Sequence, residues 1–250
     1  MSKSTTDALD LFADEKNRHI KQGFDLIDQI AQYITKTTMT GHRWSECIAT
    51  SLLSSVLGSD RFISNSKGKL KLNVWFMNIG PSGLATKTTP LKSYFVPILI
   101  RVGEKADYPF LLPAKWSVES LINYMGKHSV GCLYRDEFTG MLKETTTKDY
   151  LADSLEFLSE LYDGTVQKRV TFAHGLTDIA NVYVTFITAT TPYLYKILRS
   201  DFYTQGTGNR ILVELFSEVD ISEVEIDPEK FFQGPRFEQE RSTFIDEVAE

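Results

Sequence analysis

Cysteine is scarce in this chain, and long hydrophobic runs are missing. The two cysteines, Cys47 and Cys132, have no CxxC or Cys/His ligand spacing, which argues against a disulfide framework and a zinc site. The longest apolar stretches, such as 95–100, are far shorter than the roughly 20 residues that cross a bilayer. The first residues lack the apolar core of a signal peptide. We therefore expect a protein with no membrane association, located in a reducing cytoplasm.

Several catalytic and nucleic-acid-binding signatures are also missing. The histidines show no metal-ligand spacing, and no serine or cysteine lies in a nucleophile-elbow context, so hydrolase triads have no support. There is no RNP, zinc-finger or RGG signature. The histidines concerned are His19, His42, His128 and His174.

Acidic residues are concentrated at one end of the chain. The sequence has 33 acidic and 27 basic residues, for a net charge of -6. Of these, 11 acidic and 3 basic residues lie in 218–250, which leaves 22 acidic and 24 basic residues before it. A solvated tail is the simplest explanation of the acidic segment. The rest of the chain is nearly neutral, so the overall charge does not exclude contact with nucleic acid.

Hydrophobic periodicity predicts strands that alternate with helices, which is the pattern of an α/β sheet covered on both faces. We expect an N-terminal helical extension over 1–58 packed on the core, a core over 59–217, and an acidic segment over 218–250 that ends in a helix. An independent, partner-binding helical hairpin is the alternative for the first segment. The expected strands are 61–63, 70–77, 130–134, 169–172, 182–189 and 210–216. The expected helices are 14–36, 44–57, 87–102, one that Ser117 caps, 149–162, 192–198 and 237–248. Within 87–102, Pro90 should lie in the first turn and Pro97 should kink or end the helix.

The segment 74–89 runs from a strand through a glycine-bearing loop into Lys-Thr and a helix, which is the order of a phosphate-binding P-loop. Glycines let backbone N–H groups approach phosphates, a lysine reaches the β/γ oxygens, and a hydroxyl holds Mg²⁺. Lys87 and Thr88 would take the last two roles. The candidate phosphate-binding residues are Gly80, Pro81, Ser82, Gly83, Thr86, Lys87, Thr88 and Thr89.

The loop departs from the G-x-x-x-x-G-K-[ST] pattern in two places. Thr86 stands where the pattern has glycine, and Gly80 is one residue further from Lys87 than the pattern allows. An ordinary turn followed by a helix is therefore an equally good explanation of this motif by itself.

A second motif favours the nucleotide-binding interpretation. An apolar strand ends at Tyr134 and Arg135 and runs directly into Asp136-Glu137, a Walker B pattern. In that pattern the aspartate organises Mg²⁺ and the glutamate polarises the attacking water. The alternative is that the strand simply ends and both acids are solvated. The Lys-Thr pair upstream makes this alternative weaker than the nucleotide-binding interpretation.

With these motifs the sequence resembles the P-loop ATPase domains of AAA+ and primase-helicase type that phages, plasmids and archaeal viruses carry. Within that group it is most similar to the DnaA-like replication ATPases of spindle-shaped archaeal viruses, the fuselloviruses. The resemblance covers roughly residues 72–215. Its segments are Gly80–Gly83 with Lys87-Thr88, Asp136–Gly140, Glu160–Gly164, Thr188–Pro192 and Gly206–Arg210.

We expect little or no helical lid of the AAA+ type, because the sequence leaves room for one helix after the last expected strand. The resemblance implies an α/β P-loop NTPase (AAA+/ASCE-like) core, and it assigns further roles. Thr190 would be the polar sensor, with Thr188 and Thr191 as competitors. Arg210 would be the arginine finger that a neighbouring subunit supplies, so a homo-oligomer would complete the site in trans. A structural ion pair is the alternative for Arg210. The loop at 138–148 would face the centre of the oligomer and contact DNA.

We therefore expect an oligomeric protein, a ring or a filament, that binds and hydrolyses ATP with Mg²⁺ in viral or plasmid DNA replication, as an initiator, helicase or helicase loader. Glu137, Thr190 and Arg210 would be its catalytic residues, and Thr88 and Asp136 its metal ligands. Two alternatives remain open. One is an ATP-binding switch that hardly hydrolyses ATP, and the other is a DNA-binding scaffold with a degenerate P-loop.

Overall fold

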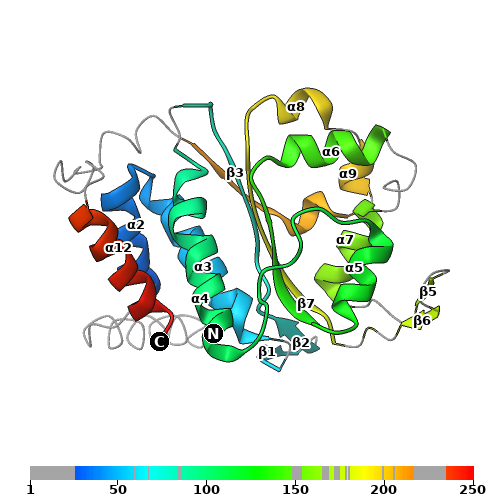
Figure 1. Ribbon diagram of the computed structural model, residues 1–250. Helices are drawn as coiled ribbons and strands as arrows, with labels where there is room; N and C mark the ends of the chain where they lie inside the picture. Colours follow the sequence, from blue (N-terminus) through cyan, green and yellow to red (C-terminus); the bar gives the residue numbers. More distant parts are fainter. Residues whose placement is uncertain are drawn as a thin grey trace, which may run out of the picture.

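A four-stranded parallel sheet forms the centre of the structure, a computed structural model (Figure 1). Its strands lie in the order β4 (Val130–Arg135), β7 (Tyr183–Thr190), β3 (Trp75–Ile79) and β8 (Leu212–Leu215). The prediction of an α/β fold is therefore confirmed. The structure describes residues 26–58, 60–66, 68–83, 86–147, 154–164, 169–171, 175–177, 179, 181–198, 200–204, 206–216 and 235–250. Within these ranges, no helix combines the length and the apolar character that crossing a bilayer requires.

Helices cover both faces of this sheet (Figure 1). One layer contains α2 (Leu26–Thr38), α3 (His42–Leu57), the π-helical turn η1 (Leu91–Phe95), α4 (Val96–Ala106) and α12 (Pro235–Val248). The other contains α5 (Val118–Met125), α6 (Phe138–Thr147), α7 (Ser154–Asp163), α8 (Leu194–Ile197) and α9 (Ser200–Thr204). The described residues also form two hairpins, β1 (Phe62–Asn65) with β2 (Gly68–Lys71) and β5 (Arg169–Thr171) with β6 (Gly175–Thr177).

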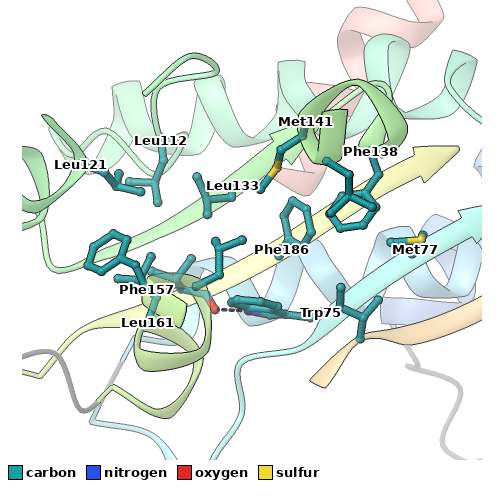
Figure 2. Packing of buried hydrophobic residues seen from close by; sticks show 14 of the residues in the cluster. Trp75, Met77, Leu112, Leu121, Leu133, Phe138, Met141, Phe157, Leu161 and Phe186 are labelled. Atoms are coloured by element: carbon teal, nitrogen blue, oxygen red, sulfur yellow. Dashed lines mark hydrogen bonds between the residues drawn. The ribbon is translucent and has the colours of Figure 1, made fainter. Parts of the chain in front are cut away.

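The strand β7 explains why both faces need cover, because it is buried along its whole length. Val184 and Phe186 face one layer, where Phe186 packs near Trp75, Leu133 and Phe138 (Figure 2). The Trp75 indole N–H donates to the carbonyl of Val184 at 2.8 Å. The alternate residues of β7, among them Ile187 and Ala189, face the other layer. A parallel strand that is buried on both faces is typical of a sheet with helices on either side.

The described part of the N-terminal segment packs directly on the sheet. Ser54 of α3 hydrogen-bonds the hydroxyl of Thr185 at 2.8 Å, and Ile30 and Ile34 of α2 are completely buried. At the other end of the chain, the ring of Phe244 in α12 stacks on Tyr33. The predicted helix over 14–36 is described only from residue 26, and the acidic segment only from residue 235.

Four sequence predictions need correction. The predicted strand 70–77 is two elements, because residues 72–74 leave the strand conformation between β2 and β3. Pro97 does not end its helix: the π-helical turn η1 widens the backbone just before it, and the helix continues as α4. The loop expected over 138–148 is the helix α6 as far as Thr147. Arg210 lies in a 3₁₀ turn rather than in a strand.

Candidate functional site

The parallel sheet brings the ends of three motif-bearing strands to one edge. Ile79 at the end of β3 pairs with Thr190 at the end of β7, and Arg135 at the end of β4 pairs with Thr188. The backbone N–H of Gly80 donates to the carbonyl of Thr190 at 3.1 Å. Segments some 50 residues apart in sequence therefore meet at the carboxyl edge, where open α/β sheets bind ligands.

Lys87 follows the glycine-bearing turn and is buried, with 7% of its surface exposed. Its ammonium donates to the carbonyl of Pro81 at 3.4 Å, and its own carbonyl accepts the indole N–H of Trp44 at 3.0 Å. Burial lowers the pKa of Lys87, while the negative charge of Glu137 acts in the opposite direction. A buried cation is costly unless an anion accompanies it, so this position favours an anionic ligand.

Thr86 has a left-handed backbone, with φ at +33°, at the position where the P-loop pattern has glycine. A β-branched residue rarely adopts this conformation. The hydroxyl of Thr86 donates to the carbonyl of Met39 at 3.1 Å and lies 3.2 Å from the hydroxyl of Thr40. The turn between α2 and α3 therefore holds the loop in a shape that glycine would adopt without strain.

Replacing Thr86 by glycine tests this strain, with alanine as the matched control. Both variants lose the hydroxyl, but only glycine removes the Cβ that disfavours the left-handed conformation. We expect Thr86→Gly to be more stable than Thr86→Ala by about 1 kcal/mol in chemical denaturation. A variant Thr86→Ala as stable as Thr86→Gly would mean that the backbone at this position carries no strain.

The two adjacent carboxylates make contacts in different helical layers. Asp136 accepts a hydrogen bond from the hydroxyl of Tyr134 and forms an ion pair with Lys92, whose Nζ lies 2.7 Å from its Oδ2. Glu137 accepts hydrogen bonds from the backbone N–H of Thr139, at 3.1 Å, and from the hydroxyl of Thr190. The first carboxylate is thus held from η1, the helical turn that follows the glycine-bearing loop. The second is held from β7 and from the first turn of α6.

Thr190 is completely buried and lies at the centre of these contacts. Its hydroxyl bonds Glu137 and lies 2.6 Å from the hydroxyl of Thr139. The hydroxyl of Thr188, a competitor for the sensor role, donates instead to the carbonyl of Arg135 at 2.9 Å. Of these two buried threonines, Thr190 is the one that hydrogen-bonds a candidate catalytic group, which keeps it the better sensor candidate.

Sequence reasoning missed three residues of this site, Lys92, Tyr134 and Thr139. Each had a usable signal. Lys92 follows Thr88 by four residues in a predicted helix, so both lie on one helical face. Tyr134 lies near the end of an expected strand and Asp136 follows it by two residues, a spacing that places both side chains on the same side if the extended backbone continues. Thr139 is the second residue of a helix that Glu137 precedes, where a capping contact is expected.

Arg210 is not among the residues that meet at this edge. It precedes β8 and therefore lies at the opposite, amino edge of the parallel sheet. Its Nη2 lies 2.6 Å and its Nε 3.2 Å from the two carboxylate oxygens of Asp163, and its Nη1 donates to the carbonyl of Gly206 at 2.7 Å. Within one subunit, Arg210 is a structural arginine that joins α7 to the turn before β8. Its role in a neighbouring subunit stays a prediction.

The residues near Asp136 fit a magnesium ion that arrives with phosphates. In the part of the chain that the structure describes, no group of three or more His, Cys, Asp or Glu side chains could hold a metal alone. Mg²⁺ is commonly held by one or two carboxylates together with substrate phosphates, so this finding does not conflict with such a site. The Asp136 carboxylate already has a cation against it, the ammonium of Lys92. Asp136 and the hydroxyl of Thr88 are the groups that would hold the ion.

Comparison with known proteins adds no further assignment. The sequence matches no protein-family model, and it matches no curated protein. The chemistry of the site therefore rests on the residues described above.

Proposed function

We propose that this chain is a magnesium-dependent ATPase with a P-loop core of the AAA+/ASCE type. The observation that supports it best is the convergence of one buried lysine and two carboxylates at the carboxyl edge of a parallel sheet. Lys87 follows β3, Asp136 and Glu137 follow β4, and Thr190 ends β7, which lies between those two strands. In the ATPases that the sequence resembles, the sensor residue lies between the Walker B strand and the γ-phosphate. The position of β7 between β4 and β3 suits this role for Thr190.

In the proposed reaction each residue has one task. The ammonium of Lys87 binds the β- and γ-phosphates, and Thr88 and Asp136 hold the metal, which supplies charge neutralisation at those phosphates. Glu137 orients a water molecule and accepts its proton as the water oxygen bonds to the γ-phosphorus. The bond from that phosphorus to the bridging oxygen of ADP breaks. Thr190, hydrogen-bonded to Glu137, fixes the direction of that carboxylate.

We further propose that the active unit is a homo-oligomer that acts on DNA during viral or plasmid replication. The finger role of Arg210 requires a second subunit, because Arg210 lies at the other edge of the sheet from Lys87. The near balance of charge before residue 218 is compatible with a local phosphate-binding surface.

A direct test measures ATP binding and turnover by the purified chain with Mg²⁺, with and without single- and double-stranded DNA, while its mass in solution is recorded. We expect saturable ATP binding, turnover that rises with DNA, and a mass above that of one chain. Absence of ATP binding would mean that residues 80–88 form an ordinary turn. DNA binding that ATP does not change would favour the scaffold alternative.

Two observations favour the second candidate, an ATP-binding switch with little hydrolysis. Glu137 is already engaged by Thr139 and Thr190, and the strained Thr86 replaces a glycine of the loop. Either feature would slow the chemical step without preventing nucleotide binding. Single-turnover measurements separate this case, since a switch would retain bound ATP over many minutes.

A further inference from the structure

Lys92 lies one helical turn beyond Thr88 and projects toward the carboxylate that we assign to the metal. Its backbone N–H donates to the carbonyl of Thr88 at 3.1 Å. Leu91, Tyr94 and Phe95, its neighbours in η1, are completely buried. These buried residues fix the orientation of the turn, so the exposed side chain of Lys92 leaves the helix on its outer side.

The Nζ of Lys92 lies 2.7 Å from Oδ2 of Asp136. This distance is typical of a charge-assisted hydrogen bond. The other oxygen of this carboxylate, Oδ1, accepts the hydroxyl of Tyr134. The ring of Tyr134 lies 6.5 Å from that of Phe95, which holds β4 and η1 together at this point. Both oxygens of Asp136 are therefore engaged by side chains of this protein.

We propose that Lys92 is a tethered cation that competes with the divalent ion for Asp136. In the nucleotide-free protein its ammonium neutralises the carboxylate. When Mg²⁺ arrives with the triphosphate, the ammonium leaves Oδ2 and its charge draws it toward the phosphate oxygens. This role rests on the proposed function, because it concerns the same metal site.

The exposure of both partners makes this exchange feasible. The side chain of Lys92 is 60% exposed and that of Asp136 is 45% exposed, so water solvates both charges during the exchange. Exposed ion pairs are weak, which means that the lysine lowers the affinity for the metal without blocking it. We therefore expect the protein to need more free Mg²⁺ than it would with a neutral residue at position 92.

Binding of Mn²⁺ in the millimolar range, followed by electron paramagnetic resonance in the absence of nucleotide, tests this competition independently of ATP turnover. Without phosphates the ion binds weakly, because one carboxylate is then its main protein ligand. We expect Lys92→Met to bind Mn²⁺ about fivefold more tightly than the parent chain. Lys92→Arg keeps the charge and should bind as the parent does. Lys127→Met is the matched control, because it removes an exposed lysine near the opposite end of β4. The double variant Lys92→Met with Asp136→Asn should lose the increase in Mn²⁺ affinity that Lys92→Met alone produces.

Equal Mn²⁺ affinity in Lys92→Met and the parent overturns the proposal, as does a gain that survives Asp136→Asn or one that Lys127→Met reproduces. Failure of Lys92→Met to bind Mn²⁺ at millimolar concentration overturns it as well. A parent chain that neither binds nor hydrolyses ATP overturns the proposed ATPase instead. In that case the Mn²⁺ measurement still decides whether Lys92 competes for Asp136.

Discussion

Glu137→Gln should bind Mg·ATP as the parent chain does and lose nearly all turnover. Glutamine has the shape of glutamate, and its carbonyl oxygen can accept the same hydrogen bonds from the Thr139 N–H and the Thr190 hydroxyl. It cannot accept a proton from the attacking water. Removing a general base typically costs roughly 10²- to 10⁴-fold in rate, so we expect a loss of at least about 100-fold in kcat with little change in nucleotide affinity. Steady-state turnover checks the expected loss of rate, and equilibrium binding of ATP to the same preparation checks that the affinity is retained.

The matched control for this variant is Glu119→Gln, an exposed glutamate in the first turn of α5. It removes one exposed negative charge from α5, a helix that contributes no residue to the candidate site, and should hydrolyse ATP at the parental rate. Parental turnover by Glu137→Gln would remove the base role from Glu137 and favour water positioning by another group.

Lys87→Met should lose nucleotide affinity and yet fold at least as stably as the parent. Methionine keeps the apolar stem that Lys87 buries, but it removes an ammonium that would make charge-assisted bonds to phosphate oxygens. Such bonds contribute about 1.5–3 kcal/mol each, so we expect ATP to bind roughly 10- to 100-fold more weakly. Isothermal titration with ATP and Mg²⁺ measures this loss, with Lys127→Met as the control that should bind normally.

The effect of pH on stability provides a second signature of Lys87. Burial holds its pKa below the ordinary value of 10.5, so the folded chain releases this proton at a lower pH than the unfolded chain does. Between these two pKa values the unfolded state binds more protons, and the contribution of Lys87 to the free energy of unfolding therefore rises with pH. Lys87→Met should lack this rise in alkaline urea denaturation. An identical pH dependence in both proteins would show that Lys87 is solvated in the native state.

Some of the architecture could be predicted from local sequence alone, where one face or both faces of an element are apolar. The strand at 183–190 is apolar or β-branched at nearly every position, and Ser117 caps α5 as expected, with its hydroxyl accepting the N–H of Ser120 at 3.2 Å. These features depend on neighbours in sequence. Where local signals conflict, prediction failed: Pro97 predicts a break, but the π-helical turn before it lets the helix continue.

The candidate site divides in the same way. Sequence spacing determined the order of the motifs, with Lys87 after one strand and Asp136 and Glu137 after another, because each motif is a local pattern of residue types. Only the tertiary structure decided which groups touch, since a contact between β7 and α6 or between η1 and β4 depends on the packing of distant segments. That packing makes Thr190 rather than Thr188 the partner of Glu137, engages Arg210 with Asp163, and sets Lys92 against Asp136.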